Sequence, residues 1–95
     1  MEAKTTAISM TRAVLKKELL LVLARHVGPG VHVTVESAMV GDLSLDSLAV
    51  MEIMAEIEDR FGIHVPDDAL MDLRTVADVL RALESRLHIK GILTE

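Results

Sequence analysis

The sequence predicts an all-α protein, a small four-helix bundle with three main helices, one short helix and a long loop between the first two helices. Apolar residues recur at helical spacing in three separate windows of the chain. Glycine follows the first two of these windows, at Gly28 and Gly62, where it is expected to end a helix. Half of the 95 residues are hydrophobic, yet one Phe is the only aromatic residue, so Leu, Ile, Val, Met and Ala must build the core.

The first helix is expected from about Thr11 to Val27, before the stop at Gly28-Pro29-Gly30. Its inward stripe is Leu15, Leu19, Val22, Leu23 and either His26 or Val27. Leu20 and Leu21 fall outside this stripe and predict an exposed apolar face on the first helix. Residues 31–46 follow as a long connection. The run VHVTV alternates like a strand but has no partner strand, which favours an extended loop held by Val33, Val35, Met39 and Leu43.

The second helix is expected from Ser47 to about Phe61, with Val50, Ile53, Met54, Ile57 and Phe61 on its inward face. A short third helix, capped by Asp67 or Asp68, should end near Asp72. Thr75 and Asp78 resemble a capping box at the start of the last helix, whose inward residues are Val76, Val79, Leu80, Leu83 and Leu87. We therefore expect a flexible leader at 1–10, a folded domain at 11–88 and a frayed tail at 89–95.

Charge is concentrated in the middle third of the chain. Residues 42–72 contain nine acids and one base, a net charge of −8, whereas the whole chain is at −5. This segment would repel nucleic acid and favours partners with basic surfaces. No segment has the length of a membrane span, so we expect no membrane insertion and a cytoplasmic location. The absence of Cys excludes disulfides, Cys-ligated zinc and thiol catalysis by the chain.

Ser47 lies at the start of the second helix, and two interpretations compete there. Position alone favours a capping serine, but Asp46 can cap equally well and would leave Ser47 for another use. The first-turn amides and the helix dipole make the same place a natural seat for a phosphate. The four histidines show no established metal spacing, and a structural or solvated role is expected for them.

The motif Asp46-Ser47-Leu48, the stretch FGIHVPDD and the run Thr75-Val76-Ala77-Asp78-Val79, following a first helix and long loop, together resemble the acyl carrier protein family over residues 11–88. The resemblance implies that Ser47 receives a 4′-phosphopantetheine arm from a phosphopantetheinyl transferase. It also implies that Asp46 contacts magnesium transiently during loading, with no permanent metal site. The family often has Gly where this chain has Ser44, a loss of flexibility that predicts a stiffer turn before Ser47.

The outward face of the second helix is the expected docking surface. Leu48, Met51 and Ala55 share it, and Glu52, Glu56 and Asp59 border it. An apolar patch with an acidic rim suits brief, charge-steered binding by loading ligases or transferases and by downstream synthase enzymes with basic surfaces. Acyl cargo would either shelter among Val50, Met54, Ile63 and Leu70 or leave them as plain core, the preferred interpretation.

The resemblance predicts a stand-alone carrier of acyl or polyketide intermediates that catalyses nothing itself. An aminoacyl, peptidyl or D-alanyl carrier is the first alternative, and a helical interaction module without any carrier role is the second. The acidic middle third favours acyl cargo. The extra leucines on the first helix leave a weak dimer open beside the expected monomer.

Overall fold

In the computed structural model, residues 10–70 and 72–93 are described and form four helices. These are α1 (Arg12–Ala24), α2 (Ser47–Phe61), α3 (Asp67–Leu70) and α4 (Val76–Ile89). Within those residues there is no β-strand, and the isolated bridges are Met10 with Leu93 and Ala38 with Thr75. The predicted all-α bundle with one short helix is confirmed. The leader expected at 1–10 lies outside the described residues except for Met10.

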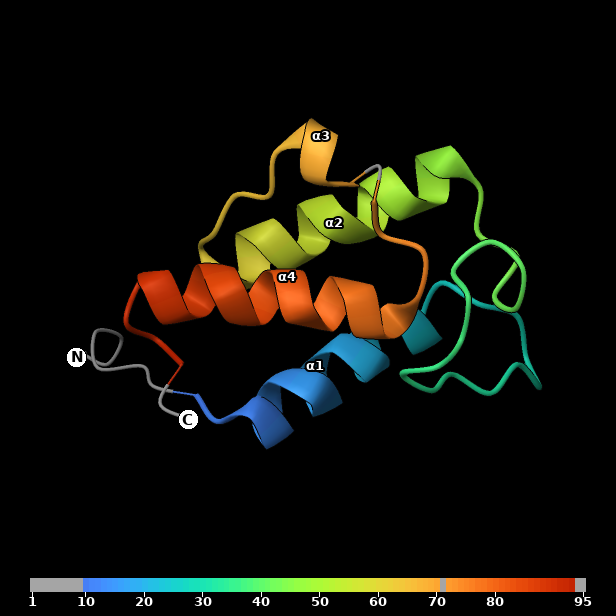
Figure 1. The fold of residues 1–95 in the computed structure, drawn as a ribbon. Helices are drawn as coiled ribbons and strands as arrows, with labels where there is room; N and C mark the ends of the chain where they lie inside the picture. Colours follow the sequence, from blue (N-terminus) through green and yellow to red (C-terminus); the bar gives the residue numbers. More distant parts are fainter. Residues whose placement is uncertain (1–9, 71, 94–95) are drawn as a thin grey trace.

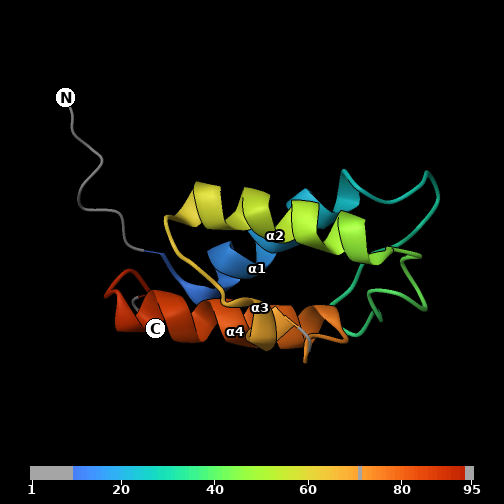
Figure 2. The same cartoon turned by 90° about the horizontal axis from the view of Figure 1, so that it is seen from above.

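The three long helices pack around a shared aliphatic core. α1 contacts both α2 and α4, and the long loop crosses one end of the bundle to join α1 to α2 (Figures 1 and 2). α3 is a single turn in the connection between α2 and α4. The fully buried side chains come from all three long helices and the two longer connections, as expected from the helical stripes: Leu15, Leu19, Leu23, Met39, Ile53, Ile57, Leu83, Leu87, Val22, Val65, Val76 and Val79.

The first helix ends three residues earlier than predicted, at Ala24 instead of Val27. The amides of Arg25 and His26 donate to the carbonyls of Val22 and Leu23, so the chain tightens into a turn of i to i+3 bonds before Gly28 is reached. Both side chains then reach Glu56 on α2. The residues that follow α1 thus contact α2, and the helix ends before the glycine to which the sequence pattern pointed.

The long loop is fastened to the start of α4, and it is extended only in part, because residues 35–36 and 39–43 form turns. The carbonyls of Val35 and Ser37 accept hydrogen bonds from the amides of Ala77 and Val76, at 2.8 and 3.0 Å. These are first-turn amides that α4 cannot satisfy internally. Apolar residues hold the rest of the loop, with Val33 and Val35 half-buried and Met39 and Leu43 buried, as predicted.

Two boundaries near the C-terminal end also differ from expectation. α3 ends at Leu70 instead of near Asp72, and Asp68 lies inside it, so Asp68 is not its N-cap. The tail was expected to fray from residue 89 onward, but α4 includes Ile89 and Leu93 is buried at 6% exposure. The amide of Met10 donates to the carbonyl of Ile92 at 2.9 Å, which ties the two described ends together.

Candidate functional site

At the start of α2, Asp46 and not Ser47 caps the helix. Asp46 is the N-cap, and its Oδ1 accepts from the amide of Ala49 at 2.8 Å. Ser47 is the first helical residue and is exposed. Among the residues that the structure describes, none forms a hydrogen bond with Ser47 Oγ. The capping interpretation of Ser47 is therefore wrong, and its hydroxyl faces solvent at a helix N-terminus.

A strained turn leads into this site. Ser44 has φ of +57°, the left-handed region that favours glycine. Leu43 and Leu45 on either side of it are both buried at 3% exposure, so the turn is anchored in the core. The amides of Ser44 and Leu45 donate to the carbonyls of Val40 and Met39. Asp46 is thus presented from a turn that the core holds in one conformation.

A pocket of about 550 Å³ opens beside Ser47. Val50 and Leu70 line it, as the alternative of a cargo shelter required, whereas Met54 is buried core at 2% exposure and Ile63 is buried at 8%. The other lining residues are Val40, Met51, Asp68 and Leu73. The preferred plain-core interpretation therefore holds for two of the four residues, and the alternative of a cargo shelter stays open for the other two.

The outward face of α2 carries the exposed apolar residues that were expected there. Leu48 is 65% exposed and Met51 is 57% exposed, and Ala55 follows them on the same face. Glu52 and Asp59 are exposed at its edge. We call these five residues the α2 face. Val40, 69% exposed, adds an apolar side chain from the loop at the Ser47 end.

Glu56 is the exception within the predicted acidic rim. Its carboxylate binds the guanidinium of Arg25 through Oε2 and the ring of His26 through Oε1, the latter at 3.1 Å. Arg25 and His26 lie 31 and 30 residues earlier in the chain, so sequence spacing carried no signal for this contact. Glu56 joins α1 to α2 and is less available to partners than Glu52.

In the part of the chain that the structure describes, the histidines and acids do not assemble a metal centre. Within residues 10–70 and 72–93, no group of three or more potential ligands from His, Asp and Glu lies together. His26 contacts Glu56, His64 contacts Glu58 at 3.1 Å, and His32 and His88 are exposed. In the same part of the chain, no helix is long and apolar enough to cross a membrane.

A family model described as "Phosphopantetheine attachment site" matches residues 14–83, which span α1 to the middle of α4. An acyl carrier protein of Thermobifida fusca is 45% identical over 56 residues, covering 59% of this chain and 71% of the relative. The chain belongs to the acyl carrier protein family. It is a carrier protein, and its prosthetic group is 4′-phosphopantetheine.

Two further relatives and a solved structure resemble this acyl carrier protein. An acyl carrier protein of Rhodococcus erythropolis is 44% identical over 59 residues, and a meromycolate extension acyl carrier protein of Mycolicibacterium aurum is 44% identical over 52 residues. The matches span 62% and 55% of this chain and 64% and 54% of those relatives. The solution structure of a hexanoyl acyl carrier protein from the actinorhodin polyketide synthase of Streptomyces coelicolor aligns with a TM-score of 0.64 at 25% identity. That alignment covers 87% of this chain and 96% of the other.

The residues at the start of α2 fit a phosphopantetheine arm. The amides of Ser47 and Leu48 have no acceptor among the described residues, since Asp46 engages the amides of Ala49 and Val50. Unpaired first-turn amides and the positive end of the helix dipole favour a phosphate at this position. Beside it, the pocket supplies an apolar surface for what the arm carries.

Proposed function

We propose that Ser47 Oγ is the attachment atom for 4′-phosphopantetheine in this acyl carrier protein. One observation carries the proposal. Asp46 takes over the cap, so the Ser47 hydroxyl is exposed and without a hydrogen-bond partner among the described residues, beside two unpaired amides. Loading from coenzyme A forms one phosphodiester bond at Oγ and releases the adenosine bisphosphate portion together with the hydroxyl proton.

The arm, when bound, supplies the terminal thiol that holds an acyl group as a thioester, which a chain without Cys cannot supply itself. The chain's own contribution is positional. α2 presents Ser47 at its exposed end, and the core leucines flanking Ser44 hold the preceding turn. The protein acts as substrate and shuttle for other enzymes and catalyses no reaction of its own.

Asp46 serves the loading reaction as well as the helix. Its Oδ1 accepts a hydrogen bond from the amide of Ala49, and no described residue forms a hydrogen bond or ion pair with Oδ2. A carboxylate oxygen of this kind suits a magnesium ion that a phosphopantetheinyl transferase brings with coenzyme A. Asp46→Asn keeps an acceptor for the cap and removes the charge, so it should slow loading while the fold stays intact.

The α2 face is the proposed docking surface for transferases, loading ligases and synthase enzymes with basic surfaces. Its exposed apolar residues and the carboxylates of Glu52 and Asp59 combine a contact area with charge steering. Val40 extends the surface onto the loop next to Ser47. The proposal places the protein in the cytoplasm, where such enzymes would meet it.

Acyl or polyketide cargo fits the pocket beside Ser47 better than an amino acid does. The lining is apolar apart from Ser47 and Asp68, and it has room for a flexible chain of methylenes. The relatives named above are acyl carrier proteins, which supports the same cargo class. The structure of the Streptomyces coelicolor protein is described as a hexanoyl form.

Intact mass after incubation with coenzyme A and a promiscuous phosphopantetheinyl transferase tests the attachment site. Wild type should gain one phosphopantetheine, and Ser47→Ala should gain none. Ser44→Gly is the matched control, because it removes a nearby exposed serine and keeps the left-handed turn. A mass gain in Ser47→Ala, or its absence in a folded Ser44→Gly, would place the attachment elsewhere.

Methyl NMR spectra of the loaded protein test the cargo. A hexanoyl thioester should shift the methyl signals of Val50, Leu70 and Leu73, while those of Leu19 in the α1 core stay in place. Unchanged Val50 and Leu73 signals would show that the cargo remains in solvent. Loading by an amino-acid-activating ligase, with no transfer from acyl-CoA, would favour the aminoacyl carrier instead.

A further inference from the structure

A second surface, away from Ser47, combines apolar side chains with unpaired positive charge. A groove of about 590 Å³ lies between α1 and residues 31–33 of the loop. Its apolar lining includes Leu20, Leu21, Val31 and Val33, and Lys16 and Lys17 stand beside them on α1. The groove shares no lining residue with the pocket at Ser47.

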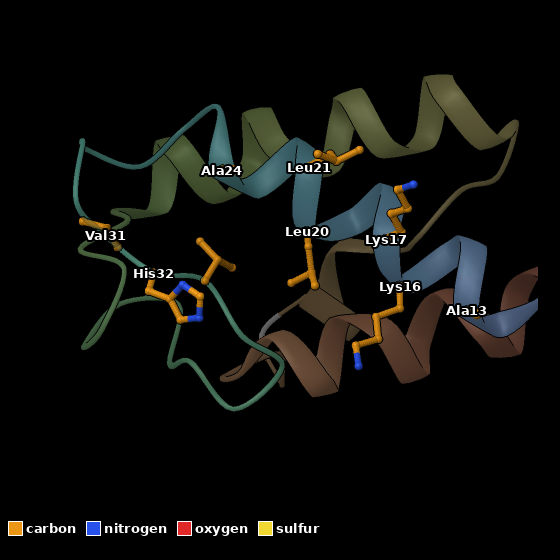
Figure 3. A pocket seen from close by; sticks show the side chains of 9 residues that line it. Ala13, Lys16, Lys17, Leu20, Leu21, Ala24, Val31 and His32 are labelled. Atoms are coloured by element: carbon orange, nitrogen blue, oxygen red, sulfur yellow. The ribbon is translucent and has the colours of Figure 1, made fainter.

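The core does not need the exposed part of this lining. The buried stripe of α1 is Leu15, Leu19, Val22 and Leu23, and Leu21 lies outside it at 54% exposure. Val31 on the opposite wall is 38% exposed. Figure 3 shows the side chains of Leu20 and His32 extending toward the space between helix and loop, from its two walls. Two apolar walls facing each other in water favour a partner that fills the space between them.

The charges beside the groove are available to such a partner. Two other bases are engaged, since Arg25 binds Glu56 and Arg60 binds Glu18. Lys16 and Lys17 are exposed, and no acid in the described ranges pairs with either of them. They form a basic site on a protein whose residues 42–72 carry a net charge of −8.

We propose that an acidic amphipathic segment of a partner protein binds in this α1 groove. The charge of this segment is opposite to that of the basic partners that bind the α2 face. Apolar side chains of the segment would enter between Leu20 and Val31, and its carboxylates would meet Lys16 and Lys17. The concave shape suits inserted side chains of a protein better than the flat surface of a lipid bilayer. The two sites share no lining residue.

The probe is a synthetic peptide of residues 47–61, an acidic amphipathic sequence with four acids and one base. Titrated into the isotope-labelled full chain, it should shift the amide signals of Leu20, Leu21 and Val31 in a manner that weakens with added salt. Lys16→Glu/Lys17→Glu should weaken binding at least about tenfold. Arg74→Glu/Arg86→Glu makes the same charge change outside the groove and should change binding by less than about twofold. A control peptide with its four acids replaced by lysine should not bind.

Each contrary result would either assign the groove to another occupant or show that it has none. Equal effects of the two double variants, or no shifts in the groove at high peptide concentration, would overturn the proposal. A third result would assign the groove to a lipid surface and overturn the proposal. In that case wild type sediments with phosphatidylglycerol vesicles, Lys16→Glu/Lys17→Glu does not, and the peptide causes no shifts. Self-association of wild type that Leu21→Glu abolishes would assign the groove to a second copy and also overturn the proposal. If wild type and Leu21→Glu both sediment as monomers and the peptide shifts the groove signals, the result supports the proposal.

Discussion

Ser44 occupies a conformation that costs free energy for any residue with a Cβ. Its φ is +57°, and buried Leu43 and Leu45 hold it there. Ser44→Gly should remove the strain and, after the extra entropy of the unfolded chain, raise the free energy of unfolding by about 0.5 kcal/mol. Ser44→Val should lower it by about 1 kcal/mol, because a β-branched side chain suits this region least. Urea unfolding followed by far-UV circular dichroism measures both, and equal stabilities would show that the turn relaxes freely.

Asp78 ties the stability of α4 to pH. The amides of Thr75 and Arg74 donate to its carboxylate, both at 3.0 Å, and these bonds lower the pKa of Asp78 below 3.8. A carboxylate with a depressed folded pKa stabilises the protein above its unfolded pKa, and the contribution is lost as the pH falls through the folded value. Unfolding free energy should therefore fall as the pH drops below about 4.

Replacing Asp78 tests this acid dependence. In Asp78→Asn, the decline of unfolding free energy below about pH 4 should be shallower than in wild type. Asp59→Asn, at an exposed position without a hydrogen bond to the described residues, is the matched control. Urea titrations at several pH values give the slopes. A decline in Asp78→Asn as steep as in wild type would assign the acid sensitivity to other carboxylates.

At the scale of elements, α2 has two kinds of acid on its surface. Glu52 is exposed and unpaired among the described residues, whereas Glu56 joins α2 to α1 through Arg25 and His26. Glu52→Gln should weaken binding to a basic phosphopantetheinyl transferase and leave stability unchanged. Glu56→Gln should lower the free energy of unfolding by about 0.5–1 kcal/mol and weaken that binding less. Calorimetric titration and urea unfolding separate the two effects, and identical behaviour of the variants would contradict the assignment.

Local signals predicted α2 correctly and α1 only in part. Asp46 and Gly62 cap α2 from within a few residues, and Gly62 has the expected positive φ of 66°. The residues just after α1 contact Glu56, far along the chain, and no spacing in α1 can indicate that contact. Ser47 was predicted because a motif carries it, whereas Val40 and Leu73 enter the pocket through connections that tertiary contacts position. The tail was missed because burial of Leu93 depends on the path of the chain at Met10.

At the scale of the whole molecule, the two described ends close the bundle. Leu93 is buried at 6% exposure, and the chain at Met10 bonds to Ile92 beside it. Leu93→Ala should lower the free energy of unfolding by about 2 kcal/mol, at the low end for a buried leucine because a chain end relaxes easily. Ile89→Ala is the matched control, since Ile89 is 75% exposed and should cost little. Thermal unfolding compares them, and equal losses would mean that the tail adds nothing to the core.

The single turn of α3 has a consequence for how the carrier accommodates cargo of different lengths. Leu70 of α3 forms part of the wall of the Ser47 pocket, opposite a long helix that the core holds firmly. Four residues in one turn gain little from helix cooperativity, so displacing them costs far less than moving α2. The wall of the pocket formed by α2 is therefore rigid, and the wall formed by α3 is easily displaced. A longer acyl chain would be accommodated by displacement of α3, and the rate of amide hydrogen exchange in α3 would vary with the length of the acyl chain.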